Sequence, residues 1–269
     1  MRSTRATVHS WRTQTGSTTR GSVSAAGRGA ADADPRVVDP VWVRQEWTVA
    51  RVLRTRRFYL LWGTFGLISF AVQQTHAHGA AYLVGNGYDP ILAAAVVGAV
   101  GLASIVAKIV VGTGSDYLGR EQMLTIGLSG GIVAEVLLIS FAGGGSPAPL
   151  LFLFAALFAM GYSVTAPLSP AIAADLFYGR HYGSIYGLLN VSGGVGGASG
   201  AWLAGYIYDR SGGYEGAWVL AAAGFALAIA FGWLAAPRRV LRTPGQARRH
   251  RAALAPTAAP APQPAPGET

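Results

Sequence analysis

The sequence has no cysteine, a single lysine and few charged residues, which make up only 12% of its 269 positions. The lack of cysteine excludes disulfides, thiolate metal sites and a cysteine nucleophile. Soluble domains carry roughly twice this fraction of charge. Together with 51% hydrophobic residues and a mean hydropathy of +0.36, the low charge therefore indicates a membrane protein.

The net charge of +9 is not evidence for nucleic-acid binding. Most arginines lie in the two ends of the chain and between apolar stretches, and they form no basic face interleaved with aromatic residues. A nucleic-acid-binding surface would show that pattern. We therefore expect no nucleic acid among the partners.

Six apolar stretches account for the composition. Each is close to the ~20 residues that cross the hydrocarbon core as a helix. They occupy residues 58–84, 90–113, 122–142, 149–176, 182–208 and 215–236. We predict an all-α, polytopic membrane bundle of six transmembrane helices, with a membrane domain over residues 51–237.

The two ends of the chain are polar. Residues 1–50 are rich in Ser, Thr, Arg and Gly, and we predict a disordered basic N-terminal tail. Residues 238–269 begin basic and become rich in Ala and Pro, which predicts a second disordered tail. Neither tail indicates a function.

Basic residues alternate between the two sides of the predicted bundle. One side has the arginines of residues 51–57, Arg120, Arg180 and Arg238, whereas the opposite side has Arg210 next to Asp209. The positive-inside rule then places both termini in the cytoplasm. We expect an integral protein of the plasma (inner) membrane.

A short polar stretch, residues 112–120, separates the second and third apolar runs with the spacing G-x-x-x-D-x-x-G-R. Gly112 and Gly119 allow a sharp reversal. Asp116 can accept from free N–H groups at a helix start, and Arg120 can hold the loop at an anionic membrane surface. An arbitrary polar turn has similar residues. The stretch resembles the loop signature of the major facilitator superfamily, which joins the second and third helices of each six-helix half.

A glycine seam in the fifth apolar run carries a second resemblance. Gly193, Gly197 and Gly200 allow helices to touch backbone to backbone. With the proline-containing fourth run, the seam is similar to the tenth and eleventh helices of facilitator transporters, closest to the monocarboxylate and oxalate/formate branch. The resemblance covers roughly residues 46–236.

The resemblance implies half of a transporter. Facilitator transporters contain two six-helix halves that rock about a midplane site, and this chain matches the second half. We interpret the chain as a truncated or split C-terminal half. A separate six-helix half, or a homodimer partner, would supply the other cavity wall.

Lys108 lies within the second apolar run. A cation there is costly unless it is paired or hydrated, so it indicates a cavity or ion path. The alternative is that its long side chain reaches the headgroups. The resemblance implies that Lys108 binds a substrate carboxylate. The resemblance also implies that Gly193 stands where oxalate carriers have a second cation. With one cation in place of two, a monoanion is the expected substrate.

Three further residues are candidates for substrate binding. Gln74 and His78 are four residues apart and share a helix face, and Asn190 can donate a hydrogen bond. Polar residues in a membrane helix also join helices to one another, and that interpretation is open for all three. Glu135 lies within the third run and is a candidate proton relay.

Two further classes of function have some support. Residues 197–200 match the G-x-S-G of rhomboid proteases, but the only histidine after Ser199 is His250 in the basic tail, so the serine lacks a base. A packing protein or small channel is also conceivable, although no filter motif is present. We therefore expect a secondary active transporter, not an enzyme, that moves a small organic anion by alternating access. A proton is a candidate coupled ion, and no cofactor or metal is expected.

Overall fold

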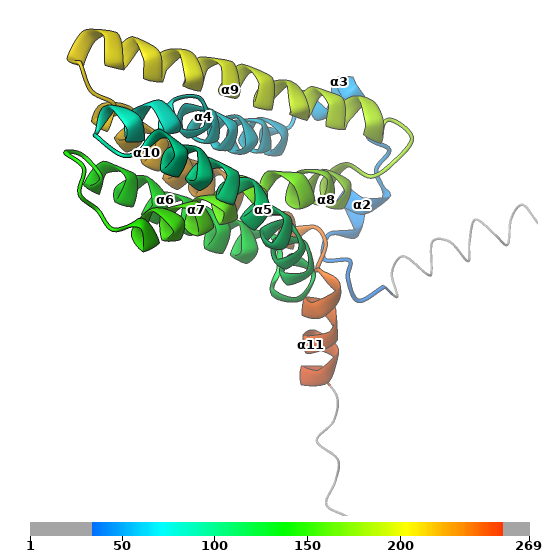
Figure 1. The fold of residues 1–269 in the computed structure, drawn as a ribbon. Helices are drawn as coiled ribbons and strands as arrows, with labels where there is room; N and C mark the ends of the chain where they lie inside the picture. The colour runs from blue at the N-terminus through cyan, green and yellow to red at the C-terminus, as the bar shows by residue number, and fades with distance from the viewer. Residues whose placement is uncertain (1–33, 255–269) are drawn as a thin grey trace, which may run out of the picture. The chain divides into compact units, whose positions relative to one another are not determined.

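Six long helical rods follow one another in the order of the predicted spans (Figure 1). The computed structural model describes residues 34–254 of the chain. The rods are α4 (Arg56–Gly85), α5 (Pro90–Leu118), α6 (Arg120–Ser140), α7 (Ala148–Ser163) continued by α8 (Thr165–Phe177), α9 (Tyr182–Ser211) and α10 (Glu215–Ala235). The prediction of an all-α membrane bundle is confirmed.

Local sequence explains where several rods begin and end. The Thr55 hydroxyl accepts from the Phe58 N–H at the start of α4. At the start of α5, Asp89 accepts from two free N–H groups, and Pro90 occupies the first helical position, where no N–H is needed. Gly212 ends α9 in the left-handed conformation, with φ of 74°. These signals depend on neighbouring residues alone and do not require the fold.

The junction between α5 and α6 corrects the predicted loop. Helix α5 continues through Gly112 and Asp116 to Leu118, and α6 begins at Arg120. Gly119 alone breaks the helical path, with φ of 120° that L-residues rarely adopt. Asp116 therefore lies in the last turn of a helix, and the expectation that it accepts from N–H groups at a helix start is wrong.

The fourth span is broken in the middle. Pro167 has no N–H to donate to the Ser163 carbonyl one turn earlier, and the ladder is interrupted here between α7 and α8. Pro170 removes a further donor inside α8. At this break the Ser163 hydroxyl donates to the Ser104 carbonyl of α5 at 3.2 Å. The break thus fixes this span against α5.

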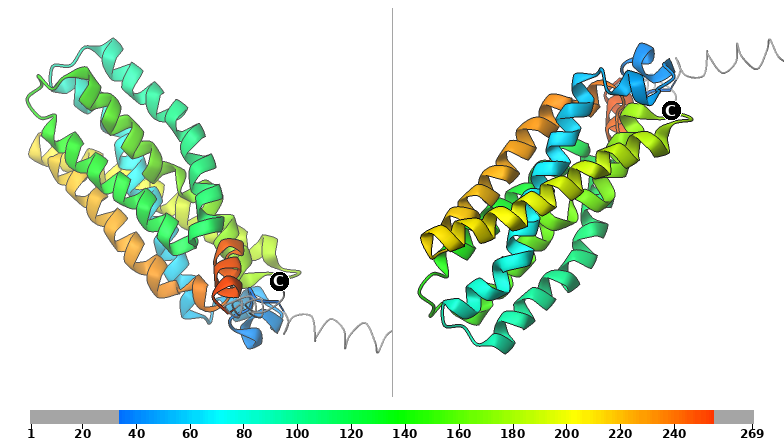
Figure 2. Two further views of the ribbon diagram at one scale, coloured as in Figure 1. Left: turned by 90° about the horizontal axis from the view of Figure 1, so that it is seen from below. Right: turned by 90° about the horizontal axis from the view of Figure 1, so that it is seen from above.

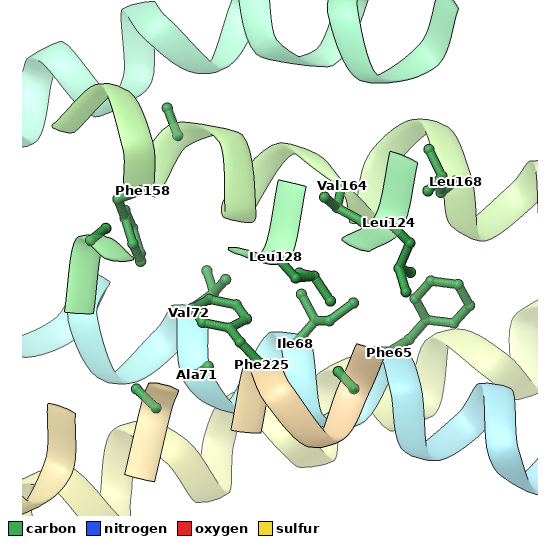
Figure 3. Packing of buried hydrophobic residues seen from close by; sticks show 14 of the residues in the cluster. Phe65, Ile68, Ala71, Val72, Leu124, Leu128, Phe158, Val164, Leu168 and Phe225 are labelled. Atoms are coloured by element: carbon green, nitrogen blue, oxygen red, sulfur yellow. The ribbon is translucent and has the colours of Figure 1, made fainter. Parts of the chain in front are cut away.

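Helix α4 lies at the centre of the packing. Its residues Phe65, Ile68 and Val72 meet side chains from α6, α7, α8 and α10, as Figure 3 shows. Close backbone contacts replace side chains where α4 meets α9, because a Cβ at Gly196 would clash with the Gly66 carbonyl. A Cβ at Gly200 would likewise clash with the Phe70 carbonyl. The small residues are required for this approach.

Four segments of the described chain are long and apolar enough to cross a membrane. They are Pro90–Leu118, Arg120–Ser140, Ala148–Phe177 and Glu215–Arg239. Helices α4 and α9 have the length of a span but are less apolar, because α4 carries consecutive Gln, Thr and His residues and α9 carries many Gly and Ser residues. The two most polar rods are also the pair with the closest backbone contact.

Both predicted tails are partly wrong. Within residues 34–50 the chain forms α2 (Pro40–Arg44) and the start of α3 (Val49–Val52), and Trp42 donates to the Leu176 carbonyl at 2.7 Å. Beyond residue 237 it forms a 3-10 turn and α11 (Pro244–Leu254). Buried aromatic contacts, such as Trp47 against Phe177 at 5.3 Å between ring centroids, hold the N-terminal segment in place. Residues 1–33 and 255–269 lie outside the described part.

The added helices gather at one end of the bundle. Figure 2 shows α2, α3 and α11 together at the end where α5 stops and α6 starts. Gln246 of α11 donates to the Leu118 carbonyl at 3.2 Å, and Arg249 donates to the Tyr117 carbonyl. These side chains satisfy carbonyls that the end of α5 leaves free.

Candidate functional site

A cavity of about 400 Å³ opens between four of the rods. It is bounded by α4, α5, the α7–α8 break and α9. Its lining consists of Ser69, Val72, Gln73, Lys108, Tyr162, Thr165, Ala166, Gly193, Gly194, Gly197 and Ala198. Hydroxyl and amide groups and one ammonium group therefore face a space large enough for a small organic molecule.

Lys108 is the cation of this cavity. Its Nζ lies 3.5 Å from the Ser104 hydroxyl and 5.1 Å from the centroid of the Tyr162 ring. The aromatic face attracts the ammonium group and holds it at the cavity. No carboxylate pairs with Lys108 among residues 34–254. An ammonium without a counter-charge at a cavity wall favours an anionic ligand.

The cavity wall on the α9 side has almost no side chains. Gly193 and Gly197, predicted as packing residues, lie on this wall and also meet α4. A Cβ at Gly193 would lie 3.3 Å from the Ser69 hydroxyl, and one at Gly197 would lie 2.9 Å from the Gln73 Cγ. Glycine at these positions therefore gives both the helix contact and the open volume. Gly200 has the packing contact alone.

Of the four residues predicted to bind substrate, Lys108 is at the cavity and the other three are not. Gln74 is completely buried and its amide has no hydrogen-bond partner in the described chain. Its neighbour Gln73 lines the cavity instead. Sequence alone offered two consecutive glutamines, and only the packing of α4 against α9 decides which one faces the space.

His78 and Asn190 have structural contacts. The His78 ring lies 3.1 Å from the Tyr214 hydroxyl and 3.0 Å from the Ala201 carbonyl, so it joins α4 to α9 and to the turn before α10. Asn190 is exposed and donates to the Tyr186 carbonyl of its own helix at 2.9 Å. Both side chains therefore bond to the helices themselves, and neither residue is part of the cavity lining.

The loop motif forms an ion cluster. Arg120 donates to Asp116 at 2.7 Å, to the Ser115 hydroxyl at 2.6 Å and to Asp175 of α8 at 3.0 Å. The cluster ties the end of α5 and the start of α6 to α8. Sequence reasoning missed Asp175, which lies at the end of an apolar run and has no motif around it.

Glu135 has the most secluded carboxyl group of the membrane domain within residues 34–254. Its side chain is completely buried, and one oxygen accepts from the Thr75 hydroxyl of α4 at 2.7 Å. The other oxygen has no hydrogen-bond partner in the part of the chain that the structure describes. This group does not line the cavity.

A bundle of membrane-length helices around a lined cavity defines a polytopic integral membrane protein. The family assignment agrees: the chain belongs to the Major Facilitator Superfamily, whose family model matches residues 58–264. Among solved structures, a mutant of the peptide transporter POT in complex with alafosfalin is similar, with a TM-score of 0.60 and 18% identity. The match covers 73% of this chain and 43% of that one, so the chain spans less than half the length of the solved transporter. No curated protein matches the sequence.

The family also excludes the protease that residues 197–200 suggest. Major facilitator proteins are transporters and not enzymes. In agreement, the Ser199 hydroxyl donates to the Gly196 carbonyl of its own helix at 2.9 Å, and no histidine contacts it within residues 34–254. The serine thus has no base that would activate it.

Proposed function

We propose that the chain is the C-terminal half of a secondary active transporter that carries a small organic anion, such as a monocarboxylate, by alternating access. The observation that carries this proposal is Lys108, an unpaired ammonium group at the wall of a 400 Å³ cavity. A substrate carboxylate at Lys108 would form a charge-assisted hydrogen bond. Ser69, Gln73 and Thr165 would donate to or accept from its remaining polar atoms.

The charge of the lining supports a monoanion. It contains one cation and no carboxylate. A dianion would leave one charge without a partner, and the ammonium group of a peptide would find no acidic group in this lining. The similar peptide transporter shows the fold, not the substrate. The charge of the lining therefore favours a monocarboxylate as the substrate, within the monocarboxylate and oxalate/formate branch of the family.

A second half completes the cavity in this proposal. The chain spans less than half of the solved transporter, and facilitator sites lie between two halves. A separately encoded six-helix half, or a second copy of this chain, would close the open side. Helices α2, α3 and α11 carry arginines, among them Arg44, Arg51 and Arg248. Under the positive-inside rule they favour a cytoplasmic position for this end of the bundle, and the proposal places both termini on that side. Transport would then be symport or antiport, with a proton as a candidate coupled ion.

Binding of lactate to the purified chain tests the proposal. We expect Lys108→Ala to weaken lactate binding at least tenfold, or about 1.4 kcal/mol, because the charged hydrogen bond is lost. Lys108→Arg keeps the charge and should keep most of the affinity. Isothermal titration in detergent, and uptake of labelled lactate, oxalate and a dipeptide by proteoliposomes, measure both effects.

Arg210→Ala is the matched control. Arg210 also lies over a tyrosine ring, at 5.1 Å from the centroid of Tyr206, but it is not at the cavity. Its loss should leave lactate binding unchanged. Equal binding by wild type and Lys108→Ala would remove Lys108 from the site, and preference for the dipeptide would overturn the substrate class.

A further inference from the structure

The contact between Glu135 and Thr75 joins two helices far from any counter-charge. Glu135 has 0% exposure, one oxygen bonded to Thr75 and one oxygen without a partner in the described residues. The amide of Gln74, next to Thr75, is also completely buried and without a partner in the same part of the chain. A buried polar group normally has a partner, so this cluster calls for an explanation.

No cation neutralises Glu135 within residues 34–254. The helices around α6 carry other titratable groups, among them His76 and Tyr82 on α4, Lys108 on α5, Tyr162 on α7 and Glu215 on α10. None of them bonds to or pairs with Glu135 in the region that the structure covers. On its own helix, Arg120 and Glu121 lie about four turns away, and Arg120 is already paired with two aspartates.

An ionised carboxylate in this position has a high free-energy cost, because it is removed from water and has no cation. A neutral carboxylic acid avoids that cost. In the neutral acid, the oxygen that accepts from Thr75 is the carbonyl oxygen, and the other oxygen carries the proton. This assignment places the proton on the oxygen that has no partner in the described chain.

The same turn of α4 contacts both this carboxyl group and the cavity. Val72 and Gln73 line the cavity, and Thr75 binds Glu135. On the next residue, the ring of His76 lies 4.9 Å from the ring of Tyr162, and the Lys108 Nζ lies 5.1 Å from the centroid of that tyrosine ring. Movement of this turn would change both sites together.

His76 offers a path for the proton. Its Nδ1 lies 3.1 Å from the Val72 carbonyl, so Nδ1 is assigned as the donor and Nε2 is left to accept a proton. A void of about 20 Å³ lies beside His76 and Thr75, between them and Val96 and Phe158. That volume can hold about one water molecule.

We propose that Glu135 and Thr75 form a proton-binding site, separate from the substrate cavity, that exchanges its proton with the cavity through His76. The proton leaves the carboxyl group, passes by way of water to His76 Nε2 and from there to water in the cavity, and the reverse path reloads Glu135. The use of this proton in transport rests on the proposed function. The binding of the proton at Glu135 does not depend on it.

Infrared spectroscopy of the purified full chain tests the site without a substrate. We expect the carbonyl band of a protonated carboxyl group at neutral pH in the wild type and its loss in Glu135→Gln. Glu215→Gln, which changes an exposed carboxyl group at the start of α10, should leave the band in place. Absence of the band in the wild type, or its persistence in Glu135→Gln, would overturn the proposal.

Variants of Thr75 and His76 test the two neighbours. Thr75→Val removes the hydrogen bond to the carbonyl oxygen and should shift the band to higher frequency, whereas Thr75→Ser should not. His76→Phe should keep the band but slow its exchange with deuterium severalfold. An unchanged exchange rate would overturn the role of His76, and an unshifted band in Thr75→Val would overturn the contact as the binding geometry.

Transport assays distinguish the proton-binding site from the proposed transport function. In proteoliposomes, Glu135→Gln should lose lactate accumulation driven by a pH gradient but retain lactate exchange at equal pH. If gradient-driven accumulation persists in Glu135→Gln, its coupling role is wrong. If the wild type moves no lactate while the carboxyl band is present, the proposed function fails and the proton-binding site stands.

Discussion

At the scale of single residues, Arg120 pairs with two aspartates, and the sequence motif contains only the more exposed one. Asp116 belongs to the sequence motif, but its side chain is 52% exposed. Asp175 has no motif, and its side chain is 12% exposed. Exposed ion pairs contribute little because water screens them, whereas removing one partner of a buried pair leaves an uncompensated charge.

The two aspartates therefore predict different losses of stability. Asp116→Asn should lower the free energy of unfolding by less than about 1 kcal/mol. Asp175→Asn should lower it by about 2–3 kcal/mol, because Arg120 then lies half-paired in a buried position. Thermal unfolding of the purified chain in detergent measures both. A larger loss of stability in Asp116→Asn than in Asp175→Asn would show that the exposed ion pair is the main stabilising contact of the α5–α6 junction.

Of the cavity residues, Lys108 can be identified from the sequence, whereas Gln73 cannot. A lone lysine in an apolar run is unusual enough to be identified from sequence, because few environments tolerate it. The two glutamines at 73 and 74 are chemically identical, so only tertiary packing distinguishes them. The spacing of Gly193 and Gly197 predicts packing, but their second role, as a wall without side chains, depends on the position of α4.

At the scale of helices, the seam between α4 and α9 depends on backbone contact. Gly196 faces the Gly66 carbonyl with no room for a methyl group, whereas Gly187, in the same helix, has nothing within 4 Å of an added Cβ. The glycine spacing predicts that a seam exists. It does not predict which glycines carry the contact, because a run of glycines at mixed spacings leaves the contacting face undetermined.

Alanine at the two glycines gives opposite predictions. Gly196→Ala should destabilise the chain by about 1–3 kcal/mol, because α4 and α9 must move apart. Gly187→Ala should be neutral or stabilise it by about 0.5–1 kcal/mol, because alanine is the better helix former. Thermal unfolding in the same detergent compares them. Equal effects at both positions would mean that the seam is not a site of close contact.

Helix boundaries follow from local signals where such signals exist. Caps such as Asp89 with Pro90 are short-range and mark the start of α5 within the sequence. The predicted end of α5 comes too early, because Gly112 and Gly114 favour a break that the packed helix does not make. The sequence does not predict α11 because its residues are polar, and side chains that bind the end of α5 hold it in place.

At the scale of the whole molecule, the outer surface divides into an apolar side and a cavity side. Val106 on α5 is 63% exposed, and so is Ile109. Lys108, on the same stretch of helix, faces the cavity. A helix with one apolar exposed face and one polar face in a bundle of this length fits contact with lipid on one side and with water on the other.

Single cysteines test that division, and the natural absence of cysteine makes every introduced thiol unique. In proteoliposomes, Ala198→Cys at the cavity should react readily with a water-soluble maleimide, because the reactive species is the thiolate, which requires water. Val106→Cys should react at least about tenfold more slowly, because a thiol in lipid stays protonated. Mass spectrometry of the labelled chain measures both rates.

The same thiols report whether a second half covers the cavity. If a separately expressed six-helix half or a second copy packs over the open side, labelling of Ala198→Cys should slow when that partner is added, while labelling of Val106→Cys stays slow throughout. Equal labelling of the two thiols at the outset would place the exposed face of α5 in water. In that case the proposed arrangement of the bundle in the membrane would be wrong, and the test would not bear on the second half.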